Sequence, residues 1–367
     1  IFIVKIKNIM RVCILGSGFS SLTLAKALVN QKIYVELISQ KKNQKISHSR
    51  TLGISKSNTD YFKKNIIDID KLLWKLNKIE IYTDNLKNEK LLDFKSNDKQ
   101  IFSILKNYEL YQVLDKDLSK NKFFKKKFYS KNKLSFLDKF EIIVNCDYLH
   151  NFTKKYFSKK IIKKYNSTAY TTVIKHKNFL NNTATQIFTK KGPLAFLPIS
   201  NIETSIVYSV HNSSKKENNI TDLIKKYNFK YQIIKMNKID SFELNSLSLR
   251  SYYYNNVLAF GDLLHKIHPL AGQGFNMTIR DVKIFTNIIK DRIDLGLPLD
   301  SSINQEFEKK LKHKNFIFSN SVDFIHEFFN IERKTNNKIL SKSVQFLGKN
   351  SFVNKVFTKI ADKGILI

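Results

Sequence analysis

The chain has 367 residues, 42% of them hydrophobic, and a formal net charge of +33. This length supports two domains or one large α/β unit with a sizeable core, which excludes a small scaffold held together by disulfides. Only six of the 64 basic residues are arginine, the side chain that best recognises bases and phosphates. We therefore interpret the charge as compositional drift and expect no nucleic-acid partner.

Two cysteines, Cys13 and Cys146, lie far apart in apolar, strand-like runs, which argues against a disulfide framework and favours a reducing compartment. No apolar run approaches the ~18 residues of a membrane span. Lys5 and Lys7 interrupt the apolar N-terminus, so we expect no signal peptide and take Met10 as the natural start. The expected location is the cytoplasm, with peripheral contact at the inner face of the membrane as a variant.

The first predicted unit is a strand at residues 12–15, a turn with Gly16 and Gly18, a helix, and a second strand at residues 33–38. A Gly-x-Gly turn in a strand–turn–helix–strand unit is typical of dinucleotide binding, because the helix N-terminus then faces the phosphates. This context makes a short and otherwise weak motif credible.

Two positions depart from the usual dinucleotide pattern. Ser21 stands at the third small position, and Ser39 ends the second strand, where an acidic residue normally binds the ribose hydroxyls. Glu36 lies inside that strand and is a poor substitute. Because one hydroxyl replaces two charged hydrogen bonds, we expect weaker binding of the adenosine half.

Six further stretches predict short strands of a mostly antiparallel sheet. They lie at residues 79–82, 91–94, 169–174, 185–189, 194–197 and 205–210. We expect this sheet to be inserted into the nucleotide-binding domain and to form a separate wall for the substrate. After Pro298 we expect amphipathic helices; for the tail at residues 346–367, core packing, a partner surface and a membrane contact all remain open.

Residues 257–282 form the most informative stretch. An apolar strand is followed, in order, by Gly261, Asp262, His265, His268, Pro269, Gly272, Gln273 and Gly274, and then by a helix. Glycines without a Cβ let a ligand approach the backbone, and the helix N-terminus offers unpaired N–H groups with a positive dipole end. A carboxylate directly after a strand lies where open α/β sheets bind ligands. The stretch predicts a site for a cofactor with phosphates, hydroxyls and a flat ring.

The two histidines of this stretch, His265 and His268, raise the question of a metal ion. No set of Cys, Asp or Glu beyond Asp262 completes a coordination shell, so we expect no metal and assign the histidines structural or cofactor-lining roles. The run from Tyr252 to Tyr254 is more simply explained by strand packing than by a pocket.

The stretch from Gly261, continued by Asn276 and the pair Arg280–Asp281, resembles the second flavin motif of the aromatic-ring monooxygenases typified by para-hydroxybenzoate hydroxylase. Within that superfamily it is most similar to the ubiquinone-biosynthesis hydroxylases. Further segments agree in the right order, namely residues 49–52, 108–111, 192–198 and 206–209. The resemblance runs from about residue 11 to about residue 330.

The resemblance implies an α/β (α+β) fold: a Rossmann-like FAD-binding domain, an inserted, mostly antiparallel substrate domain, and a helical C-terminal region. The implied ranges are 10–76, 104–160 and 250–308 for the discontinuous FAD-binding domain, 77–103 and 161–249 for the substrate domain, and 309–367 for the C-terminal region.

FAD is the implied cofactor, and its adenosine and phosphate contacts fall at both glycine turns. Gly16 and Gly18 would face the pyrophosphate, and Ser39 the adenosine ribose. Arg50 would reach the pyrophosphate or the flavin edge; its polar neighbours leave an ordinary surface arginine as the alternative. Asp262 would bind the ribityl or phosphate region.

The flavin ring would lie against the second turn. There the backbone N–H groups of Gly272, Gln273 and Gly274 would stand near the pyrimidine edge, where reduction builds negative charge. Pro269 would shape the wall beside the ring. The implied cofactor set is completed by Ser21, Asp147, Gly261 and Asn276.

One family segment matches poorly. Its usual Asp-Gly pair reads Asp147-Tyr148 here. A tyrosine does not easily take a positive φ or let a cofactor pass closely. The departure concerns reduction by NAD(P)H, the implied transient electron donor, more than flavin binding.

The implied function is FAD-dependent hydroxylation of the aromatic ring of a polyprenyl phenol in ubiquinone biosynthesis, through a flavin hydroperoxide. The expected partners are this hydrophobic substrate and a peripheral membrane or biosynthetic-complex contact. Two alternatives remain: a degenerate flavin-binding paralogue that acts as a structural subunit, and a flavin reductase or oxidase on another prenyl or aromatic substrate. No general base can be assigned.

Overall fold

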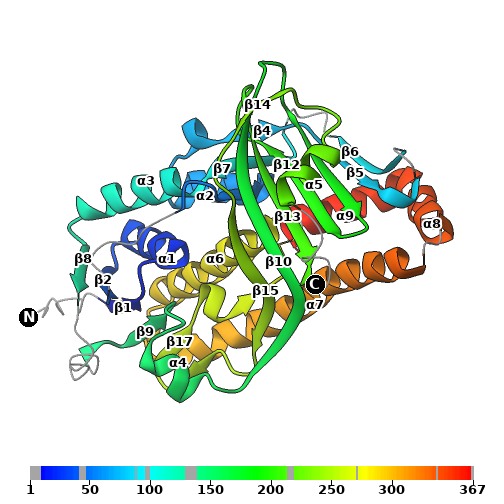
Figure 1. Ribbon diagram of the computed structural model, residues 1–367. Coiled ribbons are helices and arrows are strands. Elements are labelled where there is room, and N and C mark those ends of the chain that lie inside the picture. The colour runs from blue at the N-terminus through cyan, green and yellow to red at the C-terminus, as the bar shows by residue number, and fades with distance from the viewer. Residues whose placement is uncertain are drawn as a thin grey trace, which may run out of the picture.

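The computed structural model describes residues 10–40, 47–86, 89–95, 100–128, 139–212, 219–269, 272–335 and 338–364. Within them the strands form a six-stranded, a nine-stranded and a three-stranded sheet, and the C-terminal part is helical. In Figure 1 the largest sheet stands upright near the centre, and the six-stranded sheet lies to its lower left. The expected fold class is confirmed.

The six-stranded sheet has the order β16-β17-β9-β1-β2-β8 and is parallel except for its last pair, β16 and β17. Its strands are β1 (Arg11–Leu15), β2 (Tyr34–Ser39), β8 (Phe124–Phe128), β9 (Ile142–Asn145), β16 (Tyr253–Tyr254) and β17 (Val257–Ala259). Because β1, β9 and β17 are parallel neighbours, the turns that follow them meet at one edge of the sheet.

Three helices cover this parallel sheet and bury its apolar strands: α1 (Phe19–Asn30), α3 (Asn107–Ser119) and α6 (Gln273–Asp294). Residues 21–29 of α1 are all buried, because α1 contacts the sheet, α3 and α6. This apolar run fixes the position of the N-terminus of α1, which is the end that matters for the site. A short helix, α4 (Asn151–Tyr156), follows β9.

The nine-stranded sheet has the order β18-β15-β10-β13-β12-β11-β5-β6, with β14 paired to β10. Its strands are β5 (Lys78–Thr83), β6 (Lys90–Lys95), β10 (Lys160–His176), β11 (Thr183–Thr189), β12 (Gly192–Pro198), β13 (Glu203–His211), β14 (Ile233–Met236), β15 (Asp240–Leu249) and β18 (His265–Lys266). Every pairing is antiparallel except that of β5 with β11. All six expected strands lie inside observed ones.

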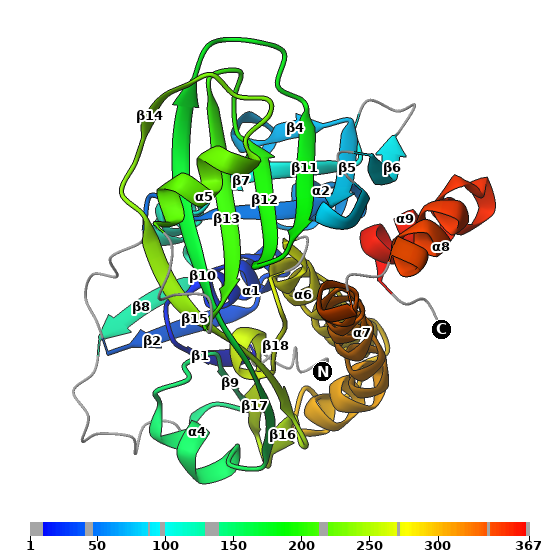
Figure 2. The same cartoon turned by 45° about the vertical axis from the view of Figure 1, so that its right-hand side comes forward.

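The two faces of the nine-stranded sheet are covered by different helices, as the alternation of side chains along a strand requires. Ile187 of β11 belongs to the cluster that packs under α5 (Ile220–Tyr227) (Figure 2). The next residue, Phe188, points to the other face and stacks on Phe329 with the ring centroids 3.5 Å apart.

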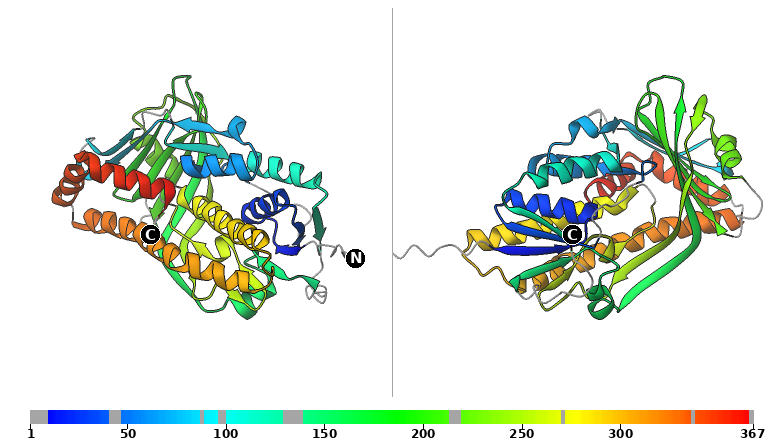
Figure 3. Two further views of the ribbon diagram at one scale, coloured as in Figure 1. Left: turned by 180° about the vertical axis from the view of Figure 1, so that it is seen from behind. Right: turned by 60° about the vertical axis from the view of Figure 1, so that its left-hand side comes forward.

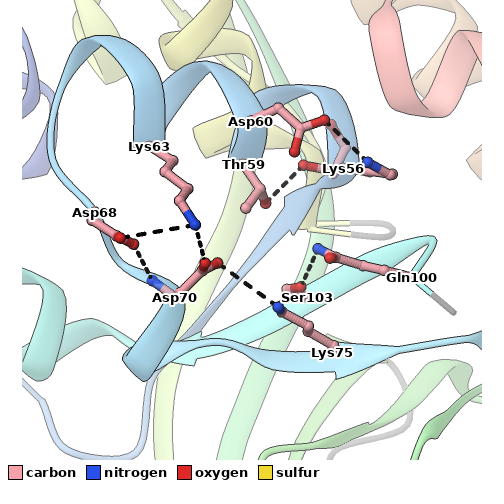
Figure 4. A network of polar contacts seen from close by, with 10 residues as sticks. Lys56, Thr59, Asp60, Lys63, Asp68, Asp70, Lys75, Gln100 and Ser103 are labelled. Atoms are coloured by element: carbon pink, nitrogen blue, oxygen red, sulfur yellow. Dashed lines mark hydrogen bonds and ion pairs between the residues drawn. The ribbon is translucent and has the colours of Figure 1, made fainter. Parts of the chain in front are cut away.

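The three-stranded sheet was not expected from the sequence. It consists of β3 (Thr51–Ser55), β7 (Phe102–Lys106) and β4 (Trp74–Leu76), in that antiparallel order, with α2 (Lys56–Asn65) after β3. Figure 4 shows a surface network beside it, in which Asp70 pairs with Lys63 and lies 3.8 Å from Lys75. These side chains are exposed, so the network contributes little to stability.

The C-terminal region consists of α7 (Ser302–Thr335), α8 (Lys338–Lys349) and α9 (Ser351–Lys363). Seen from behind in Figure 3, α6 and α7 cross the molecule and α9 returns beside them. The proposed domain division remains a prediction, but its boundary at 308/309 falls inside α7 and that at 103/104 inside β7. No helix in the described part of the chain is both long and apolar enough to cross a membrane.

Candidate functional site

The turn after β1 is shaped by two glycines with different surroundings. A Cβ on Gly16 would lie 3.3 Å from the backbone nitrogen of Asp147, so the turns after β1 and β9 touch here. Gly18 precedes α1 without a side-chain cap, and nothing lies within 4 Å of the place where its Cβ would be. The N–H groups of the first turn of α1 therefore face open space, which suits a phosphate.

The segment after β9 is held by its own hydrogen bonds. An Asp147 carboxylate oxygen accepts a hydrogen bond from the backbone N–H of Leu149 at 2.9 Å, and the Asp147 carbonyl accepts one from the Thr153 hydroxyl at 2.7 Å. Tyr148 is 47% exposed and its hydroxyl accepts a hydrogen bond from Lys160 at 3.0 Å. Tyr148 is not among the described non-glycine residues with positive φ, so its backbone is not strained at this position.

Gly261 and Asp262 follow β17 at the same edge. Gly261 has a φ of +65°, and a Cβ there would lie 2.5 Å from the Cβ of Ser20, which packs α1 directly against this turn. The Asp262 side chain is exposed to solvent although protein surrounds it. Desolvation raises the pKa of its carboxyl, and the charges of His265, Lys266 and Arg50 act in the opposite direction. An exposed carboxylate amid buried turns is suited to binding ligand hydroxyls.

The N-terminus of α6 forms the third part of the site. Gly272 caps it with a φ of +63°, no side chain caps the helix, and no acidic residue lies in its first turn. A Cβ on Gly272 would lie 3.5 Å from the Cα of Gly53 in β3. In contrast, nothing lies within 4 Å of the place where a Cβ on Gly274 would be. Gln273 is buried, and Pro269 is half-buried. Free N–H groups therefore face open space here as they do at α1.

The Asn276 side chain is held by hydrogen bonds within the protein. Its amide nitrogen donates to the carbonyls of Gly53 at 2.9 Å and Gly272 at 3.2 Å, and its oxygen accepts from the Ser55 N–H at 2.9 Å and from Asn58 at 2.8 Å. These four bonds use the whole capacity of the side chain. The Asn276 side chain thus joins β3 and α2 to α6, and its expected cofactor contact stays a prediction.

At the adenosine side, Ser39 is buried at the end of β2 and donates a hydrogen bond to the hydroxyl of Ser17 at 3.1 Å. Ser17 belongs to the first glycine turn, so Ser39 lies beside the predicted phosphate site. Glu36 pairs with Lys127 at 2.5 Å and does not replace the missing acidic residue. Ser21 is completely buried in α1, where its small size permits close packing.

Arg50 lies at the edge of the site that faces the nine-stranded sheet. Its guanidinium stands 4.5 Å from the centroid of the Phe242 ring, and its positive charge acts on Asp262. The segment before it is anchored to β15, because Asp240 accepts hydrogen bonds from Ser47 at 2.7 Å and Ser49 at 2.6 Å. Arg50 itself is exposed, so its expected contact with the cofactor stays a prediction.

The two histidines have separate environments. His265 is buried against Asp281 of α6, and the two side chains form an ion pair. His268 is buried against Tyr165 and His326, at ring-centroid distances of 4.8 and 4.5 Å. Burial lowers the pKa of His268 to about 3, so its ring is neutral. Within the described residues no three His, Cys, Asp or Glu side chains gather into a possible metal site.

Sequence reasoning missed the partners of the glycines. Ser20 meets Gly261, and Gly53 meets Gly272, across separations of more than 200 residues. Gly53 carried a weak signal, because it is one of only ten glycines and lies beside Arg50. Ser20 carried none, since a serine at the start of a helix is commonplace.

The sequence comparisons give modest but consistent similarities. The chain is 30% identical over 120 residues to the ubiquinone biosynthesis monooxygenase COQ6 of Dictyostelium discoideum, covering 32% of this chain and 23% of that protein. It is 26% identical over 152 residues to the 3-demethoxyubiquinol 3-hydroxylase of Escherichia coli, covering 39% of each. The expected resemblance to this branch is confirmed, while the matched stretches make up less than half of each relative's length.

Two results stand apart from these similarities. No family model matches the sequence. A stretch of 94 residues is 34% identical to a protein named GTP cyclohydrolase-2 of Aliivibrio salmonicida, covering 25% of this chain and 47% of that protein. Nothing in the fold accounts for the similarity to GTP cyclohydrolase-2.

Solved structures of similar fold cover nearly the whole chain. The p-nitrophenol 4-monooxygenase PnpA of Pseudomonas putida aligns with a TM-score of 0.74 over 97% of this chain and 99% of its own, at 11% identity. PqsL of Pseudomonas aeruginosa, a probable FAD-dependent monooxygenase, aligns with a TM-score of 0.70 over 91% and 99%, at 13% identity. At such identities the likeness establishes the fold.

The residues of the site fit FAD, the cofactor that this fold implies. The open positions at Gly18 and Gly274 lie where two helices begin without side-chain caps, and these suit the pyrophosphate and the anionic edge of a flavin. The exposed Asp262 lies on the turn packed against α1, where a carboxylate suits ribityl hydroxyls.

Proposed function

We propose that this chain is an FAD-dependent monooxygenase that hydroxylates the aromatic ring of a polyprenyl phenol intermediate of ubiquinone biosynthesis. The observation that carries the proposal is the meeting of the turns after β1, β9 and β17, with the N-terminus of α6 tied to β3. The similarity to COQ6 and to 3-demethoxyubiquinol 3-hydroxylase supports the choice of substrate class.

Different groups of the protein would bind different parts of the cofactor. The N–H groups at the starts of α1 and α6 would bind negative charge, and Asp262 would bind hydroxyls of the cofactor chain. The nine-stranded sheet would close the site on the substrate side and exclude water. Bound FAD, once reduced by the electron donor, would activate dioxygen, one atom of which would enter the ring while the other would leave as water.

We also propose NAD(P)H as the electron donor. The Asp147 segment no longer contains a strained glycine turn, and the exposed Tyr148 is held outward by Lys160. The backbone beside Gly16 is therefore not blocked by the tyrosine ring. Anaerobic mixing of the FAD-loaded chain with NADPH or NADH tests this, with loss of the flavin absorbance as the expected result.

The test of the main proposal uses the full chain. After incubation with FAD and gel filtration we expect a yellow protein, oxygen uptake that depends on a short-tailed prenyl phenol, and a product heavier by one oxygen atom in mass spectrometry. A folded chain that stays colourless after loading would contradict the proposal. Expression in an Escherichia coli strain that lacks 3-demethoxyubiquinol 3-hydroxylase would show whether the accumulated precursor is consumed.

A second candidate is a flavin-binding paralogue without activity, acting as a structural subunit. Ser39, in place of the usual acidic residue, and Tyr148, in place of the usual glycine, favour it. It predicts FAD binding without reduction by either nicotinamide cofactor. A reductase or oxidase would instead be reduced normally and yield a product without added oxygen, so product analysis separates all three.

We further propose that the hydrophobic substrate reaches the enzyme from an anionic membrane surface through the corner between α8 and α9. There Phe346 is 78% and Leu347 50% exposed. Between residues 338 and 363 the chain has six lysines, all exposed, and a single acidic residue. Exposed apolar side chains amid lysines are suited to an anionic lipid surface.

A further inference from the structure

A buried ion pair links the second flavin turn to α6. The Nε2–H of His265, three residues after Asp262, donates to a carboxylate oxygen of Asp281. The Asp281 side chain is completely buried and His265 nearly so. A buried pair of this kind is costly to build and often contributes little net stability, so its presence calls for an explanation besides stability.

The pair is anchored to two helices. Asp281 lies on α6, and its other carboxylate oxygen accepts a hydrogen bond from Asn315 of α7 at 3.4 Å. Tyr252 faces the same carboxylate; its pKa is raised by burial and by the charge of Asp281, so it stays neutral in the ordinary pH range. Arg280, the residue before Asp281 on α6, also interacts with the charge of Asp281, so both Arg280 and His265 oppose its negative charge.

His265 also interacts with the charge of Asp262, which precedes it by three residues. Burial lowers the pKa of His265, but the charge of Asp281, the hydrogen bond to it and the charge of Asp262 together raise that pKa above its ordinary value. In turn, His265 is the largest of the charges that oppose the upward shift of the Asp262 pKa, ahead of Lys266 and Arg50. His265 thus contacts Asp281 directly and follows Asp262 in the chain by three residues, at the start of β18.

We propose that Asp281 and His265 form a buried charge pair that fixes Asp262 as the anionic acceptor for cofactor hydroxyls, which makes His265 and Asp281 positioning residues. The inference rests on the proposed FAD site. It explains why the recognisable stretch runs on to Asp281, a full helix segment beyond the glycines. It also assigns a role to two charged residues that no cofactor atom could touch.

The test uses Asp281→Asn, which removes the charge and keeps the size of the side chain. In the FAD-free chain, the ring nitrogen shifts of His265 in NMR report its charge directly. We expect wild-type His265 to keep its proton to a higher pH than the ring in Asp281→Asn, because the variant loses the charge and the hydrogen bond that raise the His265 pKa. His265→Gln provides a second variant if Asp281→Asn folds poorly.

The second readout is the Kd for FAD, followed by flavin fluorescence across the pH range of the NMR titration. For Asp281→Asn we expect affinity about tenfold weaker than wild type above the pH at which the variant ring loses its proton, and recovery below that pH. For His265→Gln we expect a loss that does not recover at low pH. Asn315→Ala, which leaves both charges in place, should keep the wild-type pH profile.

Three results would overturn the inference: a His265 ring that titrates at the same pH in wild type and in Asp281→Asn, wild-type FAD affinity in folded Asp281→Asn at every pH, or a loss of affinity that is the same on both sides of the variant's titration. The last would indicate a purely structural pair. A wild-type chain that binds no FAD would remove the proposed function as well, whereas the three results above leave it standing.

Discussion

At the scale of single residues, the glycines of the site serve two different purposes. Gly261 has a positive φ and no room for a Cβ, because Ser20 occupies that space. Gly274 lies in the first turn of α6, and nothing lies within 4 Å of the place where its Cβ would be. The first is required by the protein itself, and the second only by a ligand, so the two can be separated by experiment.

We expect Gly261→Ala to lower the free energy of unfolding of the FAD-free chain by about 2 kcal/mol or more, from backbone strain and the contact with Ser20. Gly274→Ala should change it by less than about 0.5 kcal/mol, since its surroundings are open. Urea unfolding measures both. In contrast, Gly274→Ala should weaken FAD binding measurably; unchanged affinity would mean that the open space at α6 is not the cofactor site.

His268 allows a prediction about acid stability. Its folded pKa of about 3 lies below its ordinary value of 6.5, because burial and the charges of His326 and Lys163 oppose a positive ring. In this pH range His268 is protonated in the unfolded chain and neutral in the folded chain. The free energy of unfolding therefore falls as the pH drops from about 6.5 toward about 3. His268→Phe should reduce that fall by up to a few kcal/mol, measured by urea unfolding at several pH values.

The control for His268→Phe is His313→Phe, because His313 is exposed on α7. It should leave the acid dependence as in the wild type. Equal slopes for wild type and His268→Phe would show that His268 gains a proton without unfolding, by rearrangement around Tyr165 and His326.

At the scale of elements, Asp362 connects α9 to the site by hydrogen bonds. An Asp362 carboxylate oxygen accepts a hydrogen bond from the backbone N–H of Ser57 at the start of α2, at 2.8 Å. The Asp362 carbonyl accepts further bonds from the hydroxyls of Ser55 and Ser57, both at 2.8 Å. Since Ser55 also donates its N–H to Asn276, α9 supports the β3–α6 contact behind the second flavin turn.

We expect Asp362→Ala to cost about 1–2 kcal/mol, the usual effect of losing a cap on a helix N-terminus. Lys359→Ala, at an exposed position of the same helix, should cost almost nothing. Thermal unfolding compares the two. If both variants melt together with wild type, the contact between α9 and α2 does not form in solution.

The strands that could be predicted are those with a clear apolar signal. The first half of β10 was missed because residues 160–164 are rich in lysine, and Ile161 and Ile162 remain exposed even in the strand. Its strand conformation comes from pairing with β15, a tertiary effect that overrides local pattern. The three-stranded sheet was also missed, because β4 has only three residues, too few to show an apolar pattern.

The candidate site was predictable in its turns but not in its contacts. Glycines, a proline and an acidic residue in a fixed order indicate a cofactor turn, because few residues satisfy that backbone geometry. The spacing alone does not show that Asn276 spends all its hydrogen bonds inside the protein, or that His265 pairs with Asp281. Such pairings depend on how β3, α6 and α7 pack.

At the scale of the whole molecule, the charge of +33 gains significance from where its lysines lie relative to exposed apolar residues. Phe229 is 63% exposed on the far face of the nine-stranded sheet, beyond α5. Phe346 and Leu347 are exposed beside six lysines and almost no acidic residue. Phe229 is also flanked by lysines, namely Lys225, Lys226 and Lys230, so both surfaces combine an exposed apolar side chain with positive charge and an experiment has to decide between them.

We expect the full chain, without FAD, to sediment with vesicles that contain phosphatidylglycerol and to do so less with vesicles of phosphatidylcholine alone. Added salt should weaken the binding because it screens the lysines. The double variant Phe346→Ser/Leu347→Ser should bind about tenfold more weakly, since it no longer buries two apolar side chains in the interface. Phe229→Ser is the matched control and should bind as wild type. Equal sedimentation of the double variant and wild type would show that this corner does not contact the lipid, whatever the enzyme's substrate.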